Sequence, residues 1–308
     1  MSDRAHGGVV LQGTGGQWSV RRDDGATCVA ALRGRVKHAG GSKLAVGDEV
    51  DLEHEAPTGA WAITAIRPRR SQLARRAPGG ASGERIVVAN VDQVVVVFAM
   101  VKPEPNEKML DRFLVIAEAN DVVARIVINK TDLAAPGEAE ARFAPYGALG
   151  YPLHFTSTVT GAGLDALHDA LQGRVSALSG PSGVGKSSLL NALYPGLNLR
   201  VGAISESVKK GRHTTVGARM HPLPDGGYVV DTPGLREVGL WGLSARELDR
   251  CFPEFGDART QCRFADCRHL AEPDCAVREA LAAGRVSASR YDSYVKLREE
   301  VAEGERAR

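Results

Sequence analysis

The 308-residue sequence lacks the features that would place it in a membrane or outside the cell. It has no apolar run of about 18 residues, which excludes a membrane-spanning helix. Its first residues, MSDRAHGGVV, contain no apolar stretch of the signal-peptide type. We therefore expect a cytoplasmic protein that does not bind a membrane.

The chain also has few cysteines and a net charge close to zero. Five cysteines in a chain of this length cannot form a disulfide scaffold, and in a reducing compartment clustered cysteines are more often metal ligands. A net charge of +2 gives no global signal for nucleic-acid binding, although a local basic surface remains open. The hydrophobic fraction of 43% is too high for a disordered chain, and the length indicates two or three domains.

The pattern of apolar and polar residues changes along the chain and predicts a multi-domain protein. Residues 1–72 contain five short apolar runs separated by turn residues, which is typical of a small β-barrel. Residues 73–84 are predicted to be a linker. Residues 85–240 alternate apolar runs with helical patterns and predict an α/β domain, in which 86–89 and 94–98 are expected to be parallel strands. Residues 241–308 are predicted to be helical and to contain a cysteine cluster.

Five arginines between residues 67 and 76 make the end of the predicted barrel basic. They are either a solvated surface or a set of phosphate contacts, and the sequence leaves both interpretations open.

A phosphate-binding loop is predicted where an expected strand, 175–178, meets an expected helix, 187–193. The segment fits G-x-x-x-x-G-K-[ST], in which glycines let backbone N–H groups surround phosphates at a helix N-terminus. The lysine reaches the β- and γ-phosphates and assists catalysis, and the first serine after it binds Mg²⁺. The predicted contacts are Gly180, Pro181, Ser182, Gly183, Val184, Gly185, Lys186, Ser187 and Ser188.

The nucleotide base is predicted to be guanine. An NKTD sequence directly follows an expected buried strand that ends at Ile128. The Asp132 carboxylate can accept hydrogen bonds from N1–H and N2–H₂ of guanine, a donor pair that adenine lacks. The Lys130 stem can lie along the base, and Asn129 can connect this loop to the phosphate loop. The predicted base-binding residues are Asn129, Lys130, Thr131 and Asp132, with backbone contacts from Ser157 and Thr158.

Two further segments are expected to respond to the γ-phosphate. In DTPG, Asp231 would hold the water shell of Mg²⁺, and the Gly234 N–H would meet the γ-phosphate. In the upstream GRHTT segment, a threonine hydroxyl can join Mg²⁺ only while the γ-phosphate is present. We favour Thr215 over Thr214 for that role.

These elements stand in permuted order, because NKTD precedes the phosphate loop instead of following it. Leu235 follows Gly234, where many GTPases have a glutamine that orients the attacking water. Slow intrinsic hydrolysis is therefore expected. His213 is our candidate catalytic residue, and the alternative is that it is an ordinary loop histidine.

A structural zinc site is predicted near the C-terminus. The spacing C-x₄-C-x-H-x₅-C supplies three thiolates and one imidazole, a complete tetrahedral set with no position open for water. Free thiols are the alternative interpretation. The four predicted ligands, called the zinc cluster below, are Cys262, Cys267, His269 and Cys275.

Together, NKTD before GPSGVGKSS, then GRHTT, DTPG and the zinc cluster resemble the bacterial ribosome small subunit-dependent GTPase (RsgA) family, over nearly the whole chain. The resemblance implies an N-terminal OB-fold barrel, a circularly permuted P-loop GTPase domain and a C-terminal helical zinc domain. It also implies ribosome-stimulated hydrolysis of GTP to GDP during late maturation of the 30S subunit, with contacts to 16S rRNA. We expect a monomer with one zinc ion that uses Mg²⁺ with GTP. Two alternatives remain: a nucleotide-gated RNA-binding module, and a GTPase with a non-ribosomal protein partner.

Overall fold

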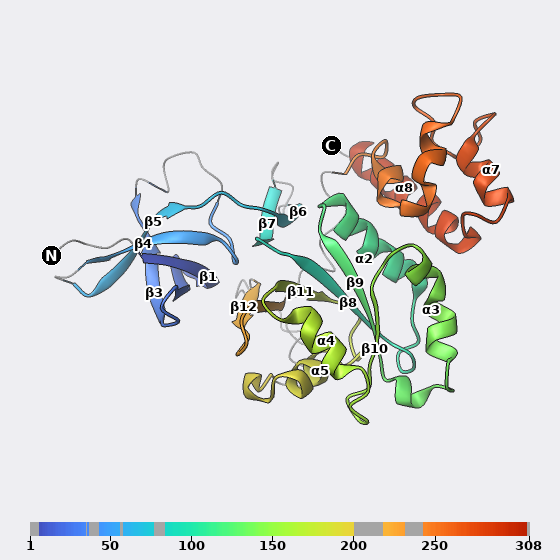
Figure 1. Cartoon of the computed structure of the whole chain (residues 1–308). Coiled ribbons are helices and arrows are strands. Elements are labelled where there is room, and N and C mark those ends of the chain that lie inside the picture. The colour runs from blue at the N-terminus through green and yellow to red at the C-terminus, as the bar shows by residue number, and fades with distance from the viewer. Residues whose placement is uncertain are drawn as a thin grey trace.

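The computed structural model describes residues 6–34, 36, 43–55, 58–76, 84–199, 218–231 and 243–306. Its described part arranges three units from left to right in Figure 1: a barrel, a central sheet covered by helices, and a group of C-terminal helices beside α2. None of the helices in these ranges has the length and the apolar character needed to cross a membrane.

The N-terminal unit is a closed five-stranded barrel. Its strands are β1 (His6–Thr14), β2 (Gln17–Arg22), β3 (Thr27–Leu32), β4 (Glu49–Glu55) and β5 (Ala60–Ile66). They are ordered β1-β2-β3-β5-β4, with β4 paired back on β1 and only β3 and β5 parallel. This Greek-key order is that of an OB-fold and confirms the predicted barrel. Alternate residues face inward and form its core: Val10, Val20, Ala30, Val50, Leu52 and Ile63.

The central unit is a six-stranded sheet ordered β10-β9-β8-β11-β13-β12. Its strands are β8 (Gln93–Ala99), β9 (Val123–Asn129), β10 (Leu153–Phe155), β11 (Val175–Ser179), β12 (Arg219–Pro222) and β13 (Tyr228–Asp231), all parallel to their neighbours except β12. Every residue of β8 is buried. This is the pattern of a strand covered on both faces.

Helices cover both faces of this sheet. Val94, Val96 and Phe98 share a core with α2 (Glu107–Ala119) and α3 (Glu138–Ala148), whereas Val95 and Val97 share one with α4 (Leu164–Leu171) and α5 (Lys186–Leu193). The helix expected at 187–193 is α5, whereas the helical pattern of α3 is interrupted by Pro145. Short 3-10 helices, η2 (Thr131–Leu133) and η3 (Pro195–Leu197), follow β9 and α5.

The junction between barrel and sheet differs from the prediction. Residues 73–76 of the expected linker, together with Gln72, form β6 (Gln72–Arg76), which pairs antiparallel with β7 (Glu84–Ala89). Residues 86–89 therefore belong to a two-stranded ribbon and not to the parallel sheet. Leu73 and Val88 are fully buried in the core shared with α2, which explains why this ribbon is apolar. The domain boundaries themselves stay a prediction.

The three arginines near the barrel exit whose side chains are described, Arg67, Arg69 and Arg70, form ion pairs within the chain. Arg69 donates to both carboxylate oxygens of the buried Asp48, at 2.6 and 2.9 Å. Arg67 pairs with Asp51 and Arg70 with Asp92, each at 2.8 Å. Arg67 and Arg69 therefore bind the exit segment to the barrel, and Arg70 binds it to the start of the sheet, which neither of the two interpretations open from the sequence had included.

The C-terminal unit consists of η4 (Leu248–Cys251), η5 (Pro253–Thr260), α7 (Ala276–Ala282) and α8 (Ala288–Arg306). Its core is built from aromatic side chains, among them Phe252, Phe255 and Tyr294, and it includes Val115 of α2. The unit thus packs on the outer side of α2, as Figure 1 shows at the upper right. The fold class predicted from the sequence is confirmed.

Candidate nucleotide site and zinc centre

The predicted phosphate loop occupies the turn between β11 and α5. Gly180 has a φ of +130°, and a Cβ there would lie 2.0 Å from the carbonyl oxygen of Val97. Lys186 begins α5, and its Nζ donates to the carbonyl oxygens of Gly180 (2.8 Å) and Pro181 (2.7 Å). The loop therefore curls around its own lysine, in a conformation that requires glycine at position 180.

The predicted base-binding loop is connected directly to the phosphate loop. Asn129 ends β9, and its Nδ2 donates to the carbonyl oxygen of Val184 at 2.9 Å. The Nζ of Lys130 donates to the carbonyl oxygens of Gly183 (2.6 Å) and Lys102. A Cβ at Gly185 would lie 2.5 Å from the Asn129 amide nitrogen, so this close approach also requires glycine.

Asp132 and Ser157 lie next to each other although 25 residues separate them. The hydroxyl of Ser157 donates to Asp132 Oδ1 at 2.5 Å and accepts the backbone N–H groups of Val159 and Thr160 at 3.2 Å. Ser157 is buried, whereas Asp132 is exposed. This hydrogen bond fixes the orientation of an exposed carboxylate just after the end of β9.

The remaining predicted nucleotide residues lie around the same edge of the sheet or outside the described ranges. Thr131 and Thr158 flank the Asp132–Ser157 contact, and Ser187 and Ser188 are in the first turn of α5. Asp231 ends β13 opposite Leu178 of β11, so it reaches the edge where the phosphate loop begins. His213, Thr214, Thr215, Gly234 and Leu235 lie outside the described residues.

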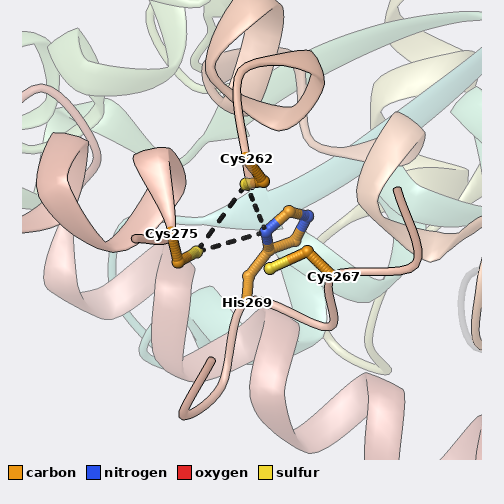
Figure 2. Close-up of side chains that lie close together, drawn as sticks. All are labelled: Cys262, Cys267, His269 and Cys275. Carbon is orange, nitrogen blue, oxygen red and sulfur yellow. Dashed lines mark hydrogen bonds between the residues drawn. The ribbon is translucent and has the colours of Figure 1, made fainter. Parts of the chain in front are cut away.

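The zinc cluster brings four ligand atoms to one point in the C-terminal unit (Figure 2). These atoms all lie within 4.8 Å of one another. Cys262 Sγ is 3.9 Å from Cys275 Sγ, and His269 Nδ1 is 3.5 and 3.4 Å from these two sulfurs. A tetrahedral Zn²⁺ with Zn–S bonds of about 2.3 Å places its sulfurs about 3.8 Å apart. The geometry therefore fits one structural zinc ion.

Aromatic residues hold the histidine of the zinc cluster. His269 is buried, and its ring contacts Phe255 edge-on with the centroids 5.8 Å apart. Its backbone has a φ of +58°, which is uncommon for a residue other than glycine. The Tyr291 hydroxyl donates to the His269 carbonyl oxygen, and the Tyr294 hydroxyl donates to that of Arg268 at 3.0 Å. α8 thus fixes the backbone that presents the imidazole.

A buried ion network joins the C-terminal unit to the sheet domain. Arg290 of α8 donates from Nε to Glu254 Oε1 at 2.6 Å and from Nη1 to Asp111 Oδ1 of α2 at 2.8 Å. Asp111 also accepts hydrogen bonds from Ser293 (2.5 Å) and Tyr146 (2.9 Å). Burial disfavours the charged guanidinium, but the carboxylates of Glu254 and Asp111 outweigh this and raise the pKa of Arg290.

Sequence reasoning missed several of these groups because nothing local marks them. Lys102, whose carbonyl oxygen holds Lys130, belongs to the loop after β8, and Asp249 beside His269 lies 13 residues before the first cysteine of the cluster. The only available signal was general: a loop at the carboxyl end of a central strand lies beside the site.

The fold and these sites define a class, that of circularly permuted P-loop GTPases with a zinc-binding C-terminal unit. The profile of the RsgA GTPase family matches residues 66–241. A small ribosomal subunit biogenesis GTPase RsgA from Gemmatimonas aurantiaca is 62% identical over 96% of this chain and 97% of its own length. The chain therefore belongs to the RsgA GTPase family, and it is a GTP hydrolase that uses Mg²⁺ with GTP.

Other relatives and solved structures agree. The RsgA of Moorella thermoacetica is 41% identical over 97% of this chain and 99% of its own length. The crystal structure of YjeQ from Thermotoga maritima has 36% sequence identity and a TM-score of 0.81, covering 97% of this chain and 99% of that one. YloQ, described as a circularly permuted GTPase, has 29% identity and a TM-score of 0.74, covering 97% and 96%.

Proposed function

We propose that this chain hydrolyses GTP during small ribosomal subunit biogenesis and that the small subunit stimulates this hydrolysis. The observation that carries the proposal is the match to an RsgA of that function over 96% of this chain at 62% identity. The match also covers 97% of the length of that relative.

Guanine recognition is assigned to the two loops joined by the Asp132–Ser157 hydrogen bond. Asp132 accepts from the base, Lys130 supports its face, and Asn129 keeps the base loop in register with the phosphate loop. The contacts of Asn129 and Lys130 with the carbonyl oxygens of residues 183 and 184 support this assignment. Thr131, Ser157 and Thr158 complete the base site through the backbone.

The phosphates are assigned to the loop 180–188, with Lys186 as the counter-charge. Its Nζ rests on the carbonyl oxygens of its own loop, so binding requires it to exchange these for phosphate oxygens. Ser187, Thr215 and Asp231 would hold Mg²⁺, which neutralises phosphate charge when it is bound. Gly234 is assigned to the γ-phosphate. Leu235 cannot hydrogen-bond a water, so we assign the orientation of the attacking water to His213 when the activator is present.

The proposed partner within the small subunit is 16S rRNA, and we expect the protein to act as a cytoplasmic monomer. The OB-type order of the barrel supports an RNA partner, since this fold often binds oligonucleotides. Arg69 is buried in its pair with Asp48, whereas Arg67 and Arg70 are 43% and 60% exposed and can still contact phosphates from their weak surface pairs.

Steady-state GTP turnover with and without purified 30S subunits tests the proposal. A rise of about tenfold or more supports it, and an unchanged rate overturns it. Binding that requires GTP without faster turnover would instead identify a nucleotide-gated RNA-binding module. Lys186→Ala is the inactive control, and His213→Ala should lose the stimulated rate while nucleotide binding is unchanged.

The base assignment has its own test. Asn in place of Asp132 offers one acceptor and one donor, which match N1–H and the 2-carbonyl of xanthine. Asp132→Asn should therefore favour XTP over GTP in competition binding. A variant that still prefers GTP would refute the role of Asp132 without affecting the ribosomal assignment.

A further inference from the structure

The two ring nitrogens of His269 face different partners. Nδ1 is directed at the sulfurs of Cys262 and Cys275, at 3.5 and 3.4 Å, as Figure 2 shows. Nε2 faces Asp249 Oδ2 at 3.5 Å. A neutral imidazole can offer a lone pair from one nitrogen only, and the other nitrogen must then carry the proton. The zinc ligand is therefore Nδ1, and the proton belongs on Nε2.

We infer that Asp249 is a positioning residue of the zinc centre, whose carboxylate accepts the Nε2 proton of His269 and so directs the Nδ1 lone pair at the metal. Histidine ligands in proteins commonly donate their second N–H to a carboxylate, which fixes ring orientation and increases ligand basicity. Here the orientation needs such support, because the His269 backbone has a φ of +58°. Tyrosine hydroxyls hold the backbone, and Asp249 holds the ring.

The surroundings of Asp249 make this contact effective. The Asp249 side chain is only 21% exposed and that of His269 only 1%, so little water competes for the Nε2 proton. The 3.5 Å separation is longer than the usual N–H···O distance of about 2.7–3.2 Å, so a small approach of the carboxylate completes the hydrogen bond. A bound Zn²⁺ withdraws electrons from the imidazole, which makes Nε2–H a stronger donor to the carboxylate.

Asp249 also connects the zinc cluster to the sheet domain. It lies on η4, whose neighbouring residues Leu248 and Cys251 are fully buried in the core that contains Val115 of α2. Cys275 of the zinc cluster belongs to the same core. Loading of the metal and packing of η4 on α2 are therefore expected to favour each other.

Zinc affinity of the full chain tests this role. Asp249→Asn keeps the shape but weakens the acceptor, and losing an outer-sphere carboxylate typically lowers metal affinity 10–100-fold. Competition with a chromophoric chelator measures that change. Asp257→Asn is the matched control, because Asp257 is an exposed acid on η5 of the same unit. Equal affinity of Asp249→Asn and the parent chain would overturn the proposal.

A second background separates positioning from general structural support. In His269→Cys the ligand has no second N–H, so adding Asp249→Asn should change zinc affinity less than twofold. The same 10–100-fold loss in both backgrounds would show that Asp249 acts by another route and would overturn the proposal.

Nitrogen NMR of the zinc-loaded parent chain gives a readout that does not depend on the folding of any variant. Metal-bound Nδ1 with protonated Nε2 on His269 is expected, with slow exchange of the Nε2 proton. The opposite tautomer, or rapid exchange of that proton, would also refute the role of Asp249.

Discussion

Removing the guanidinium of Arg290 should detach the C-terminal unit from α2. The substitution Arg290→Met keeps most of the side-chain volume but removes the donors to Glu254 and Asp111. The side chains of all three residues are at most 4% exposed. The carboxylates of Glu254 and Asp111 then remain buried without the positive charge of the guanidinium, at the interface between α2 and α8.

The size of the effect follows from that burial. Breaking a buried ion pair by removing one partner costs about 3–5 kcal/mol, mainly because the remaining charge is left without compensation. The hydrogen bonds from Tyr146 and Ser293 to Asp111 satisfy part of this need, so we expect the lower end, about 3 kcal/mol. A free-energy change of 3 kcal/mol corresponds to roughly a hundredfold or more in an opening equilibrium.

Hydrogen exchange of α8 (Ala288–Arg306) in the zinc-loaded full chain measures this opening locally. Exchange should accelerate by about two orders of magnitude in Arg290→Met and remain unchanged in Arg285→Met, an exposed arginine just before α8. Adding Glu254→Gln to Arg290→Met should restore part of the protection, because it removes one of the uncompensated charges.

Two results would refute this reasoning. Acceleration of less than about fivefold in Arg290→Met, near 1 kcal/mol, would mean that the network contributes little to docking. Strictly additive effects of Glu254→Gln and Arg290→Met would mean that the two groups are not coupled.

Three other perturbations have defined outcomes. Burial and the nearby charge of Arg125 lower the pKa of His154 to about 4, so the unfolded chain binds more protons than the native one between about pH 6.5 and 4. Stability should fall as pH decreases through that range, and His154→Gln should show a shallower decrease in denaturant titrations. Gly47→Ala should destabilise the barrel junction by about 2 kcal/mol or more, because a Cβ there would lie 2.2 Å from the Ala89 carbonyl oxygen at a φ of +87°. Gly59→Ala, which has a φ of +69° but no atom within 4 Å, should lower the melting temperature less. Zinc removal by a chelator should expose the loop of the zinc cluster to trypsin, since that loop has little regular structure of its own; unchanged cleavage would contradict a structural role for the metal.

The grouping of the nucleotide residues could be predicted because it follows from strand direction. Asn129, Ser157, Gly180 and Asp231 each follow or end a strand of the same sheet, and four parallel strands bring these ends to one edge. The zinc cluster was predictable for a different reason, since its ligands lie within 14 residues of sequence, from 262 to 275. The short spacing of the ligands along the chain and the common direction of the strands can both be inferred from a single sequence.

The contacts between domains could not be predicted in this way. Asp111 and Arg290 are 179 residues apart, and each stands in a helix where a charged residue is normally exposed. Residues 86–89 were expected to be a parallel strand, but β7 pairs antiparallel with β6, because an apolar run indicates burial without specifying the direction or identity of the paired strand. Asp249 carries no local mark of its contact with His269. These outcomes depend on tertiary packing, which the periodicity of a segment does not encode.

The sheet order has a consequence for synthesis of the protein. β8 is the first strand of the sheet to be made, and the sheet extends from it in two directions: through β9 to β10, and through β11 to β13 and β12. The base-binding half, residues 93–158, can therefore assemble on β8 while the phosphate loop is still being translated, at about 5–20 residues per second. Under the proposed assignment, the base-binding loop at 129–132 is therefore made several seconds before the phosphate loop at 180–188.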